Sequence, residues 1–135
     1  LRLLGGGRIA CESLGLPGGA VECRKSELAA LLEERIERGA TLVAPLESDG
    51  HPDHATIGRV CRRLARLRNL ALVRYPIRGW QRFKPAAFRG AAWGRFELHP
   101  RALAVKRLAM RCFCARRALR PELACFQRPY EAFLL

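Results

Sequence analysis

At 135 residues, half of them apolar, the chain can form one domain with a full hydrophobic core. No apolar run approaches the roughly 18 residues of a membrane-spanning helix, and the first residues lack a signal-peptide layout, so we expect a cytoplasmic protein. The net charge of +13 comes almost entirely from arginines spread along the chain without interleaved aromatics, which indicates a compositional bias, and no nucleic-acid partner is expected.

From about residue 8 the sequence alternates between strand-like and helix-like patterns. The expected strands are 8–14, 41–44, 70–75 and 94–98, and the expected helices are 26–38, 55–68 and 100–117. Gly39 and Asn69 are expected to end the first two helices, and the chain closes with a partly buried aromatic tail at 129–134. Strand–helix–strand order with short connections is typical of a parallel sheet with crossover helices, so we predict one α/β domain over residues 1–135.

Two of the three histidines stand in one tetrapeptide, His51-Pro52-Asp53-His54, shortly after the expected strand 41–44. A neutral imidazole is a good zinc ligand, and a carboxylate beside it can fix the tautomer that leaves the other ring nitrogen free. In parallel sheets the ligand crevice lies beyond the carboxyl ends of the strands, so the tetrapeptide is where this architecture places chemistry. A catalytic zinc site needs about three protein ligands, which the tetrapeptide cannot supply alone.

Several of these residues also have a structural interpretation. The histidines could cap the following helix or face solvent, and Asp53 could be its N-cap while also orienting an imidazole. Asp49 is interpreted as a turn residue, and His99 as structural or exposed. The cysteines have no paired metal-binding spacing, and we expect buried free thiols. They are Cys11, Cys23, Cys61, Cys112, Cys114 and Cys125.

Six segments in this order resemble one protein family. They are 14–19 (LGLPGG), 42–45 (LVAP) leading to the HPDH tetrapeptide, 57–59 (IGR), 75–80 (YPIRGW), 106–107 (KR) and 129–131 (PYE). Together, over about residues 8–134, they resemble the LmbE-like, or PIG-L, zinc-dependent N-deacetylases. The resemblance implies a Rossmann-like fold, one divalent metal, usually zinc, and hydrolysis of the acetamide of N-acetylglucosamine-type groups on a sugar or glycoconjugate.

The resemblance also implies roles for individual residues. His54 is expected to be a zinc ligand. His51 is expected to face the substrate, where it would stabilise the oxyanion or protonate the leaving amine. Asp53 is expected to orient an imidazole, most plausibly that of His51. Trp80 is a weaker candidate for contact with the sugar, because packing explains a tryptophan equally well.

The sequence departs from the family in ways that bear on activity. The family's other zinc ligands, a His and an Asp, come from an AHPDD-type motif after the first strand, and the chain lacks that motif. Gly18 stands where many relatives carry an Asp, and Arg78 stands where an aromatic is common. We therefore interpret the chain as the C-terminal portion of a deacetylase without its first strand and helix, and expect weak zinc binding and no hydrolysis from residues 1–135 alone.

Two alternatives of a different class follow from the same residues. A fold without the first motif would keep a pocket but no competent metal, and would then act as a non-catalytic binding or interaction domain. A basic nucleic-acid-binding protein is favoured only by the charge and ranks third.

Overall fold

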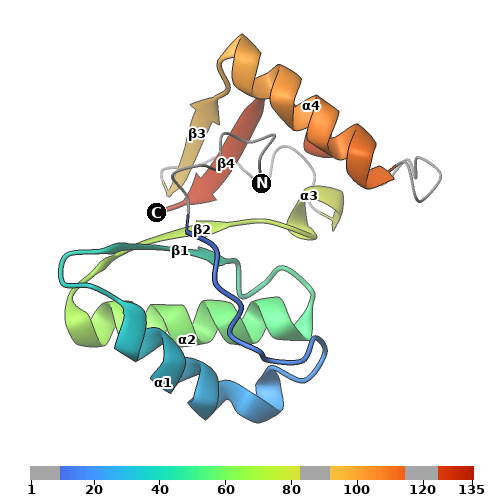
Figure 1. The fold of residues 1–135 in the computed structure, drawn as a ribbon. Helices are drawn as coiled ribbons and strands as arrows, with labels where there is room; N and C mark the ends of the chain where they lie inside the picture. Colours follow the sequence, from blue (N-terminus) through green and yellow to red (C-terminus); the bar gives the residue numbers. More distant parts are fainter. Residues whose placement is uncertain (1–9, 83–91, 115–124) are drawn as a thin grey trace. The chain divides into compact units, whose positions relative to one another are not determined.

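The computed structural model describes residues 10–82, 92–114 and 125–135 (Figure 1). The helices are α1 (Lys25–Arg35), α2 (Pro52–Arg68), α3 (Gly79–Arg82) and α4 (Pro100–Cys114), and a 3-10 turn, η3 (Glu22–Arg24), precedes α1. The strands are β1 (Thr41–Pro45), β2 (Ala71–Tyr75), β3 (Trp93–Glu97) and β4 (Tyr130–Leu134). The chain divides into two compact units, Ser13–Gly94 with Ala132–Leu135 and Leu1–Glu12 with Arg95–Glu131, and each is described by itself.

The described strands form one mixed sheet in the order β1-β2-β4-β3. β1 and β2 are parallel, with Thr41 opposite Ala71 and Pro45 opposite Tyr75, so the predicted parallel pair is confirmed. β4 runs antiparallel to β2, and the prediction of an all-parallel sheet is therefore wrong. Sequence pattern could not reveal this direction, because side chains alternate with the same period whichever way a strand runs.

In the Ser13–Gly94 unit, α2 is the crossover that makes β1 and β2 parallel. α2 lies along one face of this strand pair with α1 beside it (Figure 1). Its inner face carries Leu64 and Ala65, which are buried, as are Leu28 of α1 and Ala44 of β1. The arginines of α2 fall between these apolar positions, as the helical spacing predicts.

Gly58 lets the beginning of α2 approach the end of β1. A Cβ atom at this position would stand 2.6 Å from the carbonyl oxygen of Pro45 and 3.0 Å from Cγ of Glu47. No side chain fits this space without moving backbone. The close approach brings the first turn of α2 against the loop that carries Asp49.

Element boundaries differ from the prediction mainly near the N-terminus. In the described part of the expected strand 8–14 the chain is irregular and mostly exposed, because an alternating stretch forms a strand only when a partner pairs with it. α1 ends at Arg35, before the expected stop at Gly39, and α2 begins at Pro52 instead of residue 55. Asn69, in the left-handed conformation with φ 51°, ends α2 as predicted.

The second unit, Leu1–Glu12 with Arg95–Glu131, contains α4. Lys106 of α4 forms an ion pair with Glu131, and the guanidinium of Arg95 lies 3.9 Å above the ring of Tyr130. The helix predicted for 100–117 is confirmed from Pro100 to Cys114, and its last predicted residues lie outside the described residues. Among the helices that the structure describes, none is both long and apolar enough to cross a membrane.

Candidate functional site: a pair of histidines at the start of α2

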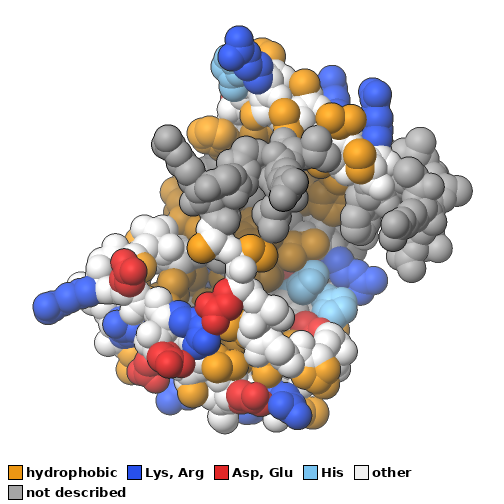
Figure 2. Space-filling model, in the orientation of Figure 1, with side chains coloured by type: hydrophobic (Ala, Val, Ile, Leu, Met, Phe, Trp, Pro, Cys, Tyr) orange, Lys and Arg blue, Asp and Glu red, His pale blue; other side chains and the backbone are white. Residues whose placement is uncertain are grey.

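His51 and His54 lie at the N-terminus of α2, beyond the carboxyl end of β1. His51 is the N-cap residue, with extended backbone (φ −125°, ψ 131°), and its Nδ1 accepts a hydrogen bond of 3.2 Å from the N–H of Asp53. The centroids of the two imidazole rings are 4.6 Å apart, and the ring planes are inclined by 31°. Both residues are partly exposed, and histidine atoms reach the surface of the unit (Figure 2).

Asp49 is fully buried, with 0 % of its surface exposed, and it anchors His54. Its Oδ2 lies 2.5 Å from Nδ1 of His54. The carboxylate also accepts hydrogen bonds from the N–H groups of three consecutive residues that follow β2. These are Ile77 at 2.7 Å, Arg78 at 2.9 Å and Gly79 at 2.8 Å. Asp49 therefore joins the loop after β1, the loop after β2 and the first turn of α2.

The surroundings of Asp49 keep it ionised. Burial opposes ionisation of the carboxyl, but the hydrogen bonds from Gly79, Arg78, His54 and Ile77 outweigh it and lower the pKa of Asp49 below its ordinary value. An ionised carboxylate only accepts hydrogen bonds, so the proton between the two side chains belongs to Nδ1 of His54.

The two imidazoles consequently hold opposite tautomers. With its proton on Nδ1, neutral His54 has a free electron pair on Nε2. His51 uses Nδ1 as an acceptor, so in the neutral ring the proton is on Nε2. The pair thus offers one acceptor nitrogen, able to bind a metal or take a proton, beside one donor N–H able to stabilise negative charge.

The Asp53 carboxylate has a different position from the one that the sequence predicts. It accepts hydrogen bonds from the N–H groups of Gly19 (2.6 Å) and Val21 (3.2 Å), and these bonds, the one from Gly19 above all, lower the pKa of Asp53 although burial opposes them. Nδ1 of His51 is already an acceptor and has no proton to give this carboxylate. Asp53 therefore orients His51 through its backbone N–H, while its side chain holds the 19–21 turn against α2.

Three more side chains fasten the same segment to α2. The hydroxyl of Thr56, 1 % exposed, donates to the carboxylate of Glu22, and Arg59 donates to that carboxylate at 2.7 Å. The bond from Thr56 is the main cause of the lowered pKa of Glu22. The chain before α1 is thus held against the first two turns of α2, next to the histidines.

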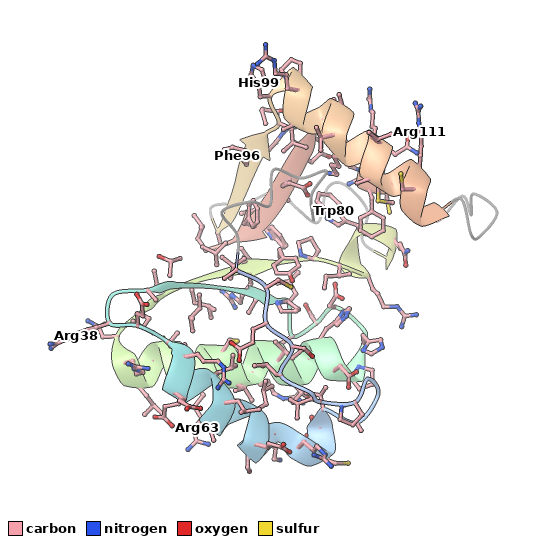
Figure 3. The ribbon with its side chains drawn as sticks, viewed as in Figure 1. Arg38, Arg63, Trp80, Phe96, His99 and Arg111 are labelled. Carbon is pink, nitrogen blue, oxygen red and sulfur yellow. The ribbon has the colours of Figure 1, made fainter. Side chains whose placement is uncertain are left out.

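Trp80, His99 and Arg78, which the sequence analysis also considered, have the following positions. Trp80 is buried, 5 % exposed, which suits packing better than a sugar platform. His99 is exposed at the start of α4 (Figure 3), where its Nδ1 accepts a hydrogen bond from the N–H of Arg101, so the structural interpretation is confirmed. Arg78 is exposed, and its backbone contacts Asp49.

The cysteines whose side chains are described are free thiols, as predicted, but burial is predicted correctly only in part. Cys61 is buried, and burial raises its pKa. Cys11, Cys23 and Cys112 are exposed.

The residues present fit part of a zinc site. His54, with one nitrogen fixed by a buried carboxylate and the other free, has the form of a metal-binding histidine. Within the described part of the chain, no three His, Cys, Asp or Glu side chains converge as a complete site would require. The described residues thus provide one candidate zinc ligand, His54, whose ring is oriented by Asp49, and a neighbouring proton donor, His51.

Asp49 is the site residue that sequence reasoning missed. In the sequence it stands in a Ser-Asp-Gly run that is typical of a turn, and the backbone does turn there. The available signal was composition, since Asp49 and Asp53 are the only aspartates in the chain and both stand beside the histidines.

Comparison of the chain with protein-family models, with curated proteins and with solved structures finds no match.

Proposed function

We propose that this chain forms part of the active site of a metal-dependent hydrolase that removes the acetyl group from N-acetylglucosamine-type amides. The observation that carries the proposal is the pair of hydrogen bonds at Nδ1 of His54 and Nδ1 of His51, which assign an Nε2 lone pair to neutral His54 beside an Nε2–H on neutral His51. Amide hydrolysis needs both a means of activating water and a donor for the charge that develops on the carbonyl oxygen or leaving amine. The segments that resemble the N-deacetylase family lend further support.

His54 would hold the metal through Nε2, with Asp49 fixing the ring. Zinc, when bound, would polarise the amide carbonyl and lower the pKa of its water toward about 7. Its remaining ligands would come from outside the residues that the structure describes, and residues 1–135 alone are expected to bind zinc weakly. Asp49 acts as a positioning residue because, among the described residues, its hydrogen bonds go to His54 and to backbone N–H groups.

His51 would act on the substrate directly. Its Nε2–H would donate a hydrogen bond to the oxygen that gains negative charge as the amide carbonyl is attacked, and it could then transfer that proton to the departing amine. The N–H of Asp53 holds the ring in the tautomer that this role requires, and the bonds of its carboxylate to Gly19 and Val21 keep the first turn of α2 in place.

The test is an acetate-release assay on the whole gene product, including any coding sequence that precedes Leu1, with zinc and an N-acetylglucosamine-type substrate. We expect His54→Ala to abolish zinc-dependent activity and His51→Ala to lower kcat by about 100- to 10,000-fold. His99→Ala, a change to an exposed histidine outside the site, is the matched control and should leave activity unchanged.

Acetate release that survives His54→Ala, or a zinc-loaded gene product that releases no acetate, would contradict the proposal. Binding of the N-acetylated sugar without hydrolysis would instead identify a non-catalytic pocket.

A further inference from the structure

The outward face of α2 carries an arginine stripe, defined as Arg59, Arg62, Arg63 and Arg66. Residues three and four apart are neighbours on a helix surface, so these four guanidinium groups are gathered along two turns. With the exposed Leu67 they line a hollow of about 250 Å³. Arg63 extends from the side of α2 that faces away from β1 and β2 (Figure 3).

Two more hollows share residues with the first. One, of about 420 Å³, lies between α1 and α2, contains Lys25, and has Arg63 and Leu67 in common with it. The other, of about 290 Å³, has Arg62 and Arg66 in common with it and reaches Arg74 of β2. These three neighbouring hollows, each lined by at least one cation, are together called the track.

Acidic side chains offset only some of this charge. Glu22 is paired with Arg59 at 2.7 Å, and Glu47 is paired with Arg62 at 2.9 Å. Glu33 also lines the groove between α1 and α2. Fewer carboxylates than cations therefore face the track.

Two arginines of the stripe keep their charge uncompensated. Arg63 and Arg66 make no ion pair with any residue that the structure describes. Each stands four residues after another arginine of the stripe, and like charges at this spacing repel on a helix. An anion in the track would relieve this repulsion.

Arg74 adds another positive charge to the track. Its Nη2 donates to the carbonyl oxygen of Leu135 at 3.4 Å, but its buried Nε has no hydrogen-bond partner within the described residues. The buried Nε is closed to a ligand, so Arg74 contributes to the adjoining hollow through the positive charge of its guanidinium group.

We infer that the arginine stripe and Arg74 form a docking surface for the phosphate backbone of double-stranded DNA. Guanidinium groups in a row match a row of phosphates, and contacts of this kind are independent of base sequence. None of the described residues that line the three hollows is aromatic, so the track offers no platform on which unpaired bases could stack, and a duplex is the better fit. This surface is separate from the histidine pair and does not depend on its function.

The test is binding of the full chain to a fluorescent duplex of about 20 base pairs, followed over a range of salt concentrations. Arg63→Gln/Arg66→Gln keeps side-chain bulk and removes the two uncompensated charges. We expect this variant to bind at least about tenfold more weakly at low salt. We also expect the negative slope of log K against log salt to become shallower by about two. Arg38→Gln/Arg101→Gln, at exposed positions off the track, is the matched control with the same loss of net charge and should bind almost as the parent chain does.

Thermal unfolding of both variants checks that each one folds. Equal weakening by the two double variants would mean that net charge alone attracts DNA, and it would overturn the inference. Undetectable binding of the parent chain at low salt, or tighter binding of a single strand than of the duplex, would also overturn it.

Discussion

Asp49 decides the chemistry of the histidine pair although it never reaches the surface. Its Oδ2 is the acceptor for both Nδ1 of His54 and the N–H of Arg78. A carboxylate can serve two donors with one oxygen, whereas an amide group in its place would turn one of its two ends into a donor. The identity of this one side chain therefore sets which nitrogen of His54 is free.

Asp49→Asn is expected to lower the free energy of unfolding by about 3 kcal/mol, because buried donors lose a charged acceptor. It should also change the tautomer of His54. Nδ1 would then accept a hydrogen bond from the new amide, and Nε2 would carry the proton. Chemical denaturation measures the first effect, and long-range proton–nitrogen correlation spectra of the imidazoles measure the second. Asp53→Asn, which disturbs the turn at Gly19 instead, is the control and should leave the His54 tautomer unchanged. An unaltered His54 tautomer in Asp49→Asn would contradict the assignment.

Sequence reasoning at this scale found the histidines but not the way they are held. The order of the expected elements places the tetrapeptide between the strand 41–44 and the helix 55–68, at the carboxyl end of the strand. Which carboxylate meets which ring depends on the contact between Asp49 and residues 77–79, about 30 positions apart in sequence. No local pattern encodes such a long-range contact.

At the scale of elements, the placement of α2 against β1 depends on the absence of a side chain at Gly58. The carbonyl oxygen of Pro45 occupies the position next to the missing Cβ, and backbone cannot rotate away as a side chain can. Strand β1 and helix α2 were predictable from their apolar periodicity, and the parallel pairing followed from the short connections. The close approach at Gly58 was not predictable, because a glycine inside a helical pattern reveals only a missing side chain.

Gly58→Ala is expected to destabilise the protein by about 2 kcal/mol, since the forced shift of α2 outweighs the gain of about 1 kcal/mol in helix propensity. Gly18→Ala is the matched control, because a Cβ at Gly18 meets no atom within 4 Å, and its effect should stay within about 0.5 kcal/mol. Both values come from urea denaturation. A neutral or stabilising effect of Gly58→Ala would show that α2 can move away from β1 without cost.

At the scale of the whole molecule, folding determines which arginines lie close together. The sequence distributes its arginines along the chain, and from this distribution a compositional bias was the natural interpretation. Helical spacing gathers four of them on the outward face of α2, where they line one hollow. Arg74 of β2 lines a neighbouring hollow together with two of these arginines. The mixed sheet could not be predicted either. The side-chain pattern of residues 130–134 is the same for both strand directions, so it does not reveal that β4 runs antiparallel to β2.

The most direct test of the account is the pair of tautomers itself, read from long-range proton–nitrogen correlation spectra of the chain near neutral pH, with and without zinc. We expect neutral His54 to carry its proton on Nδ1 and His51 on Nε2, and zinc at high concentration to shift Nε2 of His54 while His51 and His99 change little. The same tautomer in His51 and His54, or a zinc-induced shift confined to His51 or His99, would contradict the account.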